Sequence, residues 1–596
     1  MCRIAGIVNR SLPASSIEPM VKDMCTLLKA GGPDDEGFYT SARDHLVLGH
    51  RRLSIIDLSS AGHQPMPYQL ERFWITYNGE LYNYPELKVE LQNLGCHFNT
   101  ATDTEVILAA FYTWGVEAFQ RFNGMYAFAL WDAHTKDIFL VRDSSGIKPL
   151  YFAITKEGLA FASEVKALEL VPYLQQANPN WPVYLMAYGH LPEPVTTLQK
   201  VHPLEKGTYL QYNVANGRIH ATAFNRYSYL EKITDREEAI SLVKETLQKA
   251  VKRHLLADAP IGVFLSGGLD SSIIALLAQK DQQQLNTLSL YFEDSRFSEK
   301  KYQDIVHQNL SCNHHQHLLK EASFHEYLPS IIDAMDLPGS DGINTWFISK
   351  YARESGLKAV LSGIGGDELF GGYPSFQRIK AALFFEQLPK SVLRAGRFSG
   401  SKKMRRLAYL SLGGPVGRFL FLRGQFTPHE IAVNLGAHEK EIWKILADQP
   451  RLTNINHLTP PNQASWIEGN MYMQNQLLRD ADVMSMAHGL EIRVPFLDAN
   501  FIRLALHIHS SEKYKGNNGK QMLIDAFKDI LPEPIWNRPK MGFSFPFRDW
   551  FANNEFAKSI TVNDKNGYYK RFIAGEMHWS QYLTAVLITK HQQHIA

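Results

Sequence analysis

The sequence predicts an α+β domain of layered sheets covered by helices, followed by an α/β domain with a doubly wound parallel sheet and a helical C-terminal part. Residues 1–210 contain many short strands rich in aromatic and aliphatic residues, bounded by Gly, Pro, Asn and Asp turns. From about residue 235, strands and helices alternate, a pattern typical of a parallel sheet. We therefore expect a first domain over 1–210, a connection over 211–234 and a second domain over 235–596.

The elements of the first domain follow from local composition and periodicity. Its expected strands are Cys2–Asn9, Leu46–Leu48, Phe73–Tyr77, Tyr126–Trp131, Ile138–Arg142 and Tyr151–Ala153. Its expected helices are Ile17–Lys29, Pro85–Asn93 and Thr104–Trp114.

The second domain opens with an expected helix, Asp235–Leu256, whose first turn is acidic. Two strand–loop–helix units follow, each with a glycine-rich loop. The remaining expected elements are strand Ile261–Leu265, helix Ser272–Gln279, strand Thr287–Phe292, helix Thr345–Ser355 and strand Ala359–Leu361. From about residue 375 the chain is mostly helical.

Composition excludes several classes of function. The 596 residues carry 62 basic and 60 acidic side chains, a net charge of +2, so we expect neither a nucleic-acid nor a membrane partner. The four cysteines form no CxxC pair, which predicts free thiols and a reducing compartment. With no signal-peptide pattern and no apolar run of about 20 residues, we expect a cytoplasmic protein.

Cys2 is a candidate nucleophile. It follows the initiator Met1, and a small second residue favours removal of that methionine. The α-amine of an N-terminal cysteine has a reference pKa of about 7.7–8.0 and is therefore a base for its own thiol. The plain alternative is a chance cysteine ahead of an edge strand.

Three further sites have residues that suit an amide substrate. Asn78 and Gly79 follow a predicted strand and can donate an amide and a backbone N–H to an oxyanion. Asp103 can accept from an ammonium group, although it would also serve as a helix N-cap. Arg52 can clamp an α-carboxylate with its two-pronged guanidinium. Each residue alone has a structural explanation.

The segment Ser266-Gly267-Gly268-Leu269-Asp270-Ser271-Ser272 lies between a buried strand and an apolar helix. Its glycines permit close approach of a ligand, and the helix N-terminus presents free N–H groups. Asp270 can bind Mg²⁺ through a carboxylate oxygen. The segment predicts a pyrophosphate cradle without the Gly-Lys-Ser/Thr ending of a Walker A loop. The plain alternative is a capped glycine turn.

Together, the N-terminal residues resemble the glutaminase domain of class II glutamine amidotransferases, which are Ntn hydrolases with an αββα sandwich. The resemblance runs from Cys2 to about Phe161 and includes Gly32–Gly37, Gly49–Asp57, Asn78–Asn83 and Arg142–Tyr151. It implies that Cys2 is the nucleophile and that Asn78 and Gly79 bind the oxyanion. The glutamine contacts that it implies are Arg52, Ile55, Asn78, Glu80 and Asp103.

The C-terminal part resembles the N-type ATP pyrophosphatases, which have an adenine-nucleotide α-hydrolase-like fold, and in particular the asparagine synthetase family. The matching segments are Ser266–Ser272, Leu361–Tyr373, Asp482–Asp498 and Arg538–Phe543. The resemblance implies that Asp270 and Asp367 bind Mg²⁺ and that Lys540 neutralises developing negative charge. The ATP-binding residues that it implies are Leu265, Ser266, Gly267, Gly268, Asp270, Ser271, Ser272, Ser362 and Gly363.

The resemblance implies a ligase that uses glutamine, ATP and a carboxylate acceptor, with aspartate favoured. Ammonia from glutamine would cross an internal tunnel to an acyl-AMP, giving asparagine, AMP and pyrophosphate. The resemblance also suggests a homodimer.

The sequence departs from the family pattern at three places. Arg3 replaces the usual Gly after the cysteine, and Ala30-Gly31 replaces the usual His-Arg. By the resemblance, both changes lie near the glutamine pocket and leave the nucleophile intact, so they bear on glutaminase efficiency. Ile364 replaces a Glu of the second loop, and Ile cannot accept a proton. Two alternatives therefore stay open: an amidotransferase for another carboxylate, such as a uronic-acid sugar, or a glutaminase or nucleotide-binding regulatory protein without synthetase turnover.

Overall fold

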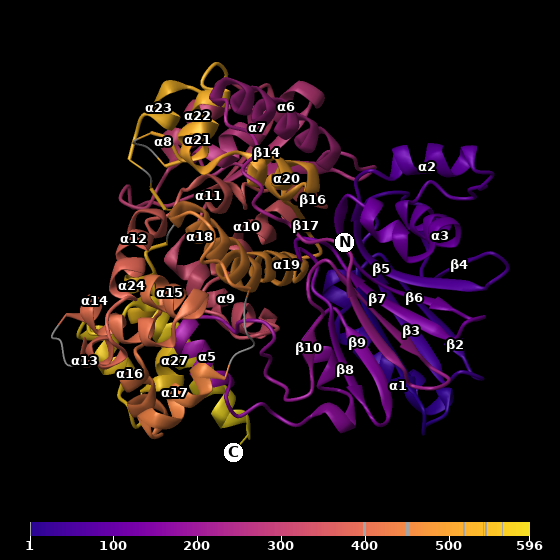
Figure 1. Ribbon diagram of the computed structural model, residues 1–596, viewed down its shortest axis with the longest axis horizontal. Coiled ribbons are helices and arrows are strands. Elements are labelled where there is room, and N and C mark those ends of the chain that lie inside the picture. Colours follow the sequence, from indigo (N-terminus) through magenta and orange to yellow (C-terminus); the bar gives the residue numbers. More distant parts are fainter. Residues whose placement is uncertain are drawn as a thin grey trace.

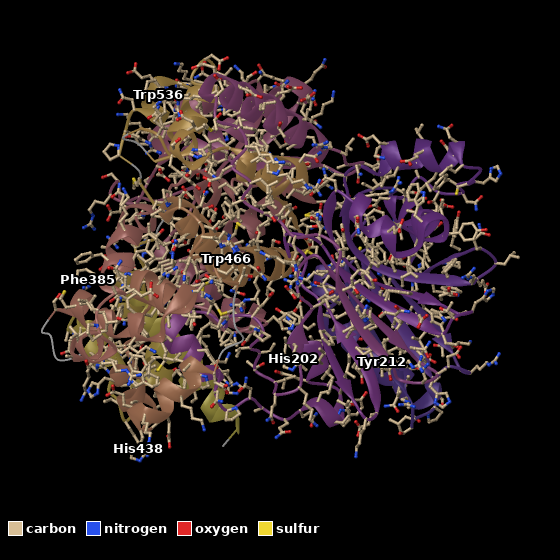
Figure 2. All side chains as sticks on the ribbon, viewed as in Figure 1. His202, Tyr212, Phe385, His438, Trp466 and Trp536 are labelled. Carbon is tan, nitrogen blue, oxygen red and sulfur yellow. The ribbon has the colours of Figure 1, made fainter. Side chains whose placement is uncertain are left out.

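The computed structural model describes residues 2–396, 401–448, 453–516, 519–539, 541–542, 545–562 and 564–595. Two halves lie side by side: an N-terminal sandwich of sheets, and a larger half with a parallel sheet and many helices (Figure 1). Tyr212 lies in the first half, whereas Trp466 and Trp536 lie in the second (Figure 2). No helix among the described residues is long and apolar enough to cross a membrane.

The sandwich consists of two antiparallel six-stranded sheets. The first has the order β10-β8-β9-β1-β3-β2, formed by His202–Pro203, Tyr151–Thr155, Gly158–Ala162, Arg3–Asn9, Leu46–Arg52 and Asp35–Ser41. The second has the order β12-β11-β7-β6-β5-β4, formed by Ile219–Ala223, Thr208–Asn213, Asp137–Arg142, Gly124–Asp132, Phe73–Leu81 and Met66–Tyr68.

An apolar core fills the space between the two sheets. Its members include Ile4, Leu48, Trp131 and Phe161, which alternate along their strands with residues facing outward. Helix α1 (Ala14–Leu27) covers the first sheet, and α3 (Asp103–Trp114), with α2 (Tyr84–Asn93) beside it, covers the second. The predicted layers of sheet and helix are thus confirmed.

Strand β5 is longer than the sequence predicted. It continues past Tyr77 to Leu81, so Asn78 and Gly79 lie on the strand and not after it. Asn and Gly are poor strand formers in isolation. Continuous pairing with β6, from Phe73 opposite Asp132 to Leu81 opposite Gly124, overrides that preference.

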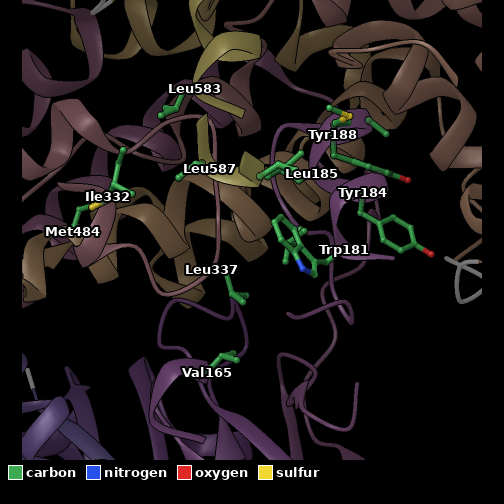
Figure 3. Packing of buried hydrophobic residues seen from close by; sticks show 14 of the residues in the cluster. Val165, Trp181, Tyr184, Leu185, Tyr188, Ile332, Leu337, Met484, Leu583 and Leu587 are labelled. Atoms are coloured by element: carbon green, nitrogen blue, oxygen red, sulfur yellow. The ribbon is translucent and has the colours of Figure 1, made fainter. Parts of the chain in front are cut away.

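The sandwich also extends past residue 210, because β12 pairs with β11 in the second sheet. We therefore propose that the first domain ends after β12. Before that point the chain makes an excursion: helix α5 (Trp181–Tyr188) leaves the sandwich and packs among helices of the second half (Figure 3). There Trp181 and Leu185 share a core with α27 (Trp579–Ile595).

The second half contains a five-stranded parallel sheet of order β15-β14-β13-β16-β17. Its strands are Cys312–Leu318, Leu285–Tyr291, Ile261–Phe264, Ala359–Leu361 and Glu491–Arg493. Strands β13 and β16 are neighbours, and each leads into a glycine-rich loop. Because parallel strands end at the same edge of a sheet, the two loops meet there. The predicted parallel sheet with a helical C-terminal part is confirmed.

Candidate active sites

Cys2 directly precedes β1, a central strand of the first sheet, and is buried. Its backbone N–H donates to Asn78 Oδ1 over 3.1 Å. Burial raises the pKa of the thiol, and the backbone N–H of Leu53 and the charge of Arg52 oppose that rise. The thiol is therefore neutral at neutral pH and needs a base, which is the role the sequence assigns to the α-amine of Cys2.

Asn78 and Gly79 provide a donor and an approach path beside Cys2. The Nδ2 atom of Asn78 is buried and has no hydrogen-bond partner among the residues that the structure describes. A buried donor without a partner is costly, which points to a ligand atom as its acceptor. A Cβ atom on Gly79 would lie 2.2 Å from the carbonyl oxygen of Met125, so only glycine fits. The pair suits an oxyanion hole.

Asp103 lies in the first turn of α3 but is not its N-cap, because Thr102 fills that position and accepts from the N–H of Glu105. Instead, Asp103 Oδ2 accepts from the hydroxyl of Tyr77 and from the N–H of Leu81, each over 2.8 Å. Burial raises the pKa of Asp103 to about 6, and these two bonds limit the rise. Its carboxylate is anionic at neutral pH and can accept an ammonium group.

This pKa predicts how glutamine binding depends on pH. Protonation of Asp103 removes the acceptor for the α-ammonium, so the glutamine KM should rise about tenfold per pH unit below pH 6. Steady-state glutaminase kinetics between pH 5 and 8 measure it. In Asp103→Asn the KM should be high at every pH. A wild-type KM that stays flat from pH 7 to 5 would remove Asp103 from the glutamine site.

Arg52 and Ile55 hold the loop that borders the thiol. The guanidinium of Arg52 donates to the carbonyls of Ser59, over 2.7 Å, and of Asp57. The carbonyl of Ile55 accepts from the N–H of Asp258, over 2.9 Å, and so joins the two domains. Contact of Arg52 and Ile55 with glutamine stays a prediction.

Glu80 is linked to the second domain by a buried arginine that the sequence analysis missed. Arg493 Nη2 lies 3.4 Å from Glu80 Oε1, and Arg493 Nε lies 2.5 Å from Glu491 Oε1. Burial, with Glu491 nearby, raises the pKa of Glu80 well above its ordinary value, although Arg493 opposes this. Both Glu491 and Arg493 belong to the family block Asp482–Asp498, which was the only sequence signal for them.

The first nucleotide loop follows β13 and leads into α7 (Leu269–Asp281), which starts earlier than predicted. Asp270 and both following serines therefore lie in the first turn of the helix. Ser266 Oγ lies 2.9 Å from Ser271 Oγ, and the hydroxyl of Ser272 donates to the carbonyl of Gly268. Gly267 has φ +80°, a conformation that favours glycine.

Two more predicted ATP-site residues anchor the loops. Leu265 is fully buried, and its N–H donates to the carbonyl of Leu288 on the neighbouring strand. Ser362 follows β16, and its N–H donates to the carbonyl of Arg493 over 2.8 Å.

The second loop packs directly against the first. A Cβ on Gly363 would lie 2.9 Å from Asp270 Cβ, and a Cβ on Gly366 would lie 2.6 Å from Asp270 Cγ. The glycines thus let the two loops approach around the Asp270 carboxylate. Asp367, in α11 (Gly366–Phe370), is brought to the same place.

Lys520 connects the two carboxylates that the sequence proposed for Mg²⁺. Its Nζ lies 2.7 Å from Asp270 Oδ2 and 2.7 Å from Asp367 Oδ1. Burial lowers the pKa of Lys520, but the two carboxylates more than offset this and raise it. Nothing in the local sequence marked Lys520. Lys540, the lysine that the resemblance singled out, lies outside the described residues.

These carboxylates fit a magnesium ion. They come from different loops, and both lie within contact of the Lys520 ammonium group, so they are close enough to share a cation. Carboxylate oxygens are ligands that Mg²⁺ prefers. Within the described ranges no group of three or more His, Cys, Asp or Glu side chains could hold a metal. Asp270 and Asp367 would therefore hold Mg²⁺ together with phosphate oxygens and water.

Ile364, at the position where the family has a Glu, packs against an apolar cluster. The second loop nevertheless carries a carboxyl group, that of Glu368. Glu368 is buried, and its Oε1 accepts from the hydroxyl of Tyr373 over 2.8 Å. Burial and the neighbouring Asp367 raise the pKa of Glu368 to about 7. The loop thus keeps a carboxyl group that titrates near neutrality, four residues after Ile364.

The sequence matches two protein-family models that together span most of its length. Residues 1–226 match the glutamine amidotransferase domain, and residues 242–572 match asparagine synthase. Asparagine synthetase [glutamine-hydrolyzing] 1 of Bacillus subtilis is 32% identical over 593 residues, covering 96% of this chain and 91% of that protein. Asparagine synthetase B [glutamine-hydrolyzing] of Escherichia coli is 28% identical over 571 residues, covering 91% and 82%. The chain belongs to the asparagine synthase family, with an N-terminal glutamine amidotransferase domain.

Proposed function

We propose that this member of the asparagine synthase family is a glutamine-dependent asparagine synthetase that moves ammonia from Cys2 to an aspartyl-AMP inside one molecule. One observation carries the proposal. A single folded chain combines a buried thiol beside the open donor of Asn78 with a carboxylate pair, Asp270 and Asp367, between two nucleotide loops.

In the glutaminase half, the thiol of Cys2 attacks the side-chain amide of glutamine while the α-amine takes its proton. The oxyanion that forms accepts from Asn78 Nδ2 and from the N–H of Gly79. The amine then gives its proton to the departing ammonia, and water releases glutamate from the thioester. Asp103, Glu80 and Arg52 hold the α-ammonium and α-carboxylate.

In the synthetase half, the serines and N–H groups of Ser266–Ser272 hold ATP, and the aspartate side chain attacks the α-phosphorus. Pyrophosphate leaves as the acyl-AMP forms. Ammonia then attacks the acyl carbon and AMP departs, because AMP is a good leaving group whereas a carboxylate oxygen is a poor one, and the nitrogen loses one proton to give the amide. Asp270 and Asp367 would hold Mg²⁺, which would supply positive charge to the phosphates. Lys520, already beside these carboxylates, adds a second positive charge where pyrophosphate departs.

A cluster of buried apolar side chains crosses the boundary between the two domains, beside the charged residues Glu80, Glu491 and Arg493. The cluster includes Leu53, Ile55 and Met125 of the first domain, and Leu490 and Ile492 of the second. Leu53 adjoins Cys2, while Ile364 of the second loop packs on the same cluster. Uncharged ammonia can pass such surroundings, whereas ammonium would pay a large desolvation penalty.

The experiment is AMP and pyrophosphate release from Mg-ATP and glutamine, with and without aspartate, alongside an asparagine assay. We expect aspartate-dependent AMP with an equal amount of asparagine. Glutaminase activity without aspartate-dependent AMP would contradict the proposal.

Ile364 favours one alternative: a carboxylate acceptor other than aspartate, such as a uronic-acid sugar, because Ile cannot take the proton released on ammonia attack. AMP release dependent on such a sugar would identify it. A nucleotide-binding regulatory role would show ATP binding without pyrophosphate release. We further propose that the protein is cytoplasmic, which its four free cysteines support. We also propose that it forms a homodimer, as the family resemblance suggests.

A further inference from the structure

Arg3, directly after the candidate nucleophile, forms a buried ionic link between the two domains. Its side chain is fully buried, with Nε 2.7 Å from Glu164 Oε1 and Nη1 2.7 Å from Asp482 Oδ2. Glu164 follows β9 in the amidotransferase domain, whereas Asp482 lies on α19 (Leu478–Met486) of the synthetase domain. A second buried cation of the first domain, Lys148, lies 3.3 Å from Asp482 Oδ1.

Gly31 makes room for Arg3. A Cβ on Gly31 would lie 2.8 Å from Arg3 Cγ and 3.0 Å from its Nε, so a side chain at position 31 and the present course of Arg3 exclude one another. Ala30 and Gly31 also line a cavity of about 270 Å³ between the domains, with Glu164 and Met486 in its wall. The departures from the family pattern at Arg3 and Gly31 are therefore coupled in the structure.

Helix α19 connects this link to the apolar cluster that crosses the domain boundary. While Asp482 faces Arg3, its neighbours Leu478, Ala481 and Met486 belong to the cluster that reaches from Leu53 to the second loop. A shift of α19 would move one wall of that cluster relative to the strand of Cys2.

We propose that Arg3 is a positioning residue for nitrogen transfer: it fixes α19 against the strand that carries Cys2, so that ammonia reaches the acceptor and does not escape to water. This inference rests on the proposed function. The guanidinium suits the role because two of its nitrogens contact carboxylates of different domains at once. The single ammonium of a lysine lacks this fixed fork.

The test compares wild type with Arg3→Lys and with the double variant Arg3→Gly/Gly31→Arg. In the double variant an arginine at position 31 would place its guanidinium in the space that Arg3 fills in the wild type. Arg10→Lys, at an exposed arginine just after β1, is the matched control. The measured quantity is asparagine formed per glutamate released at saturating Mg-ATP, aspartate and glutamine, together with glutaminase and ammonium-dependent synthesis. A second readout needs no substrate: hydrogen exchange of the α19 amides.

In Arg3→Lys we expect the asparagine-to-glutamate ratio to fall at least threefold and α19 exchange to quicken, with glutaminase and ammonium-dependent synthesis within twofold of wild type. The double variant Arg3→Gly/Gly31→Arg should regain at least half of the wild-type asparagine-to-glutamate ratio.

Two results in Arg3→Lys would overturn the proposal. One is an unchanged asparagine-to-glutamate ratio with unchanged hydrogen exchange of the α19 amides, and the other is a proportional fall of all three activities. Failure of both variants to fold would also overturn it, since Arg3 would then serve folding alone. A wild-type enzyme that makes no asparagine even from ammonium contradicts the proposed function, and α19 exchange then decides on Arg3.

Discussion

Cys2→Ala should abolish glutamine-dependent asparagine formation while leaving ammonium-dependent formation within about twofold of wild type. The substitution removes the only atom that attacks the amide, and loss of a nucleophile lowers rates by about 10⁴-fold or more. The nucleotide loops lie in another domain, so their chemistry should persist. Asparagine assays with glutamine and with ammonium chloride measure both activities.

Cys96→Ala is the control, because Cys96 is a free, partly exposed thiol of the same domain. It should behave as wild type. Loss of both activities in Cys2→Ala would contradict a separate thiol site, and retention of glutamine-dependent activity would assign the nucleophile elsewhere.

Asp270→Ala should stop AMP formation while glutaminase persists. The carboxylates of Asp270 and Asp367 both contact the Lys520 ammonium group. Losing Asp270 removes one of the two proposed metal ligands and one of these two ion pairs of Lys520. A loss of about 4 kcal/mol in transition-state stabilisation corresponds to about a 10³-fold slower AMP release. Pyrophosphate release and Mg²⁺ titration of the residual activity measure the effect.

Asp281→Ala, at the other end of α7, is the matched control and should leave AMP release unchanged. If Asp270→Ala released AMP at the wild-type rate, the assignment of the metal to these carboxylates would be wrong. A parallel loss of glutaminase would point to unfolding, which circular dichroism distinguishes.

The sequence predicted the local units well where one pattern controls them. The apolar run that forms β13, followed by glycines and serines, predicted a strand, a loop and a helix, and the structure contains all three. Strand β13 ends at Phe264, one residue earlier than predicted, and α7 runs from Leu269 to Asp281 instead of from Ser272 to Gln279. Strand β5 was predicted to end at Tyr77, before Asn78 and Gly79, and only its pairing with β6 reveals the longer strand.

What the sequence could not provide are contacts between distant segments. Lys520 lies 250 residues from Asp270, and no spacing links them. Arg493 meets Glu80 only because β17 ends beside β5 in the folded chain. In the sequence Arg3 and Gly31 are two separate departures, whereas in the fold a side chain at position 31 would occupy the space that Arg3 fills. Long-range geometry of this kind depends on tertiary packing, which periodicity does not encode.

The most direct test follows the nitrogen atom. Glutamine labelled with ¹⁵N in its side-chain amide is supplied with Mg-ATP, aspartate and an excess of unlabelled ammonium, and the asparagine formed is analysed by mass spectrometry. Transfer inside the molecule predicts asparagine whose side-chain amide is predominantly ¹⁵N despite the unlabelled pool. Asparagine that carries the isotope ratio of the bulk ammonium would contradict direct transfer from Cys2, and absence of asparagine would contradict aspartate as the acceptor.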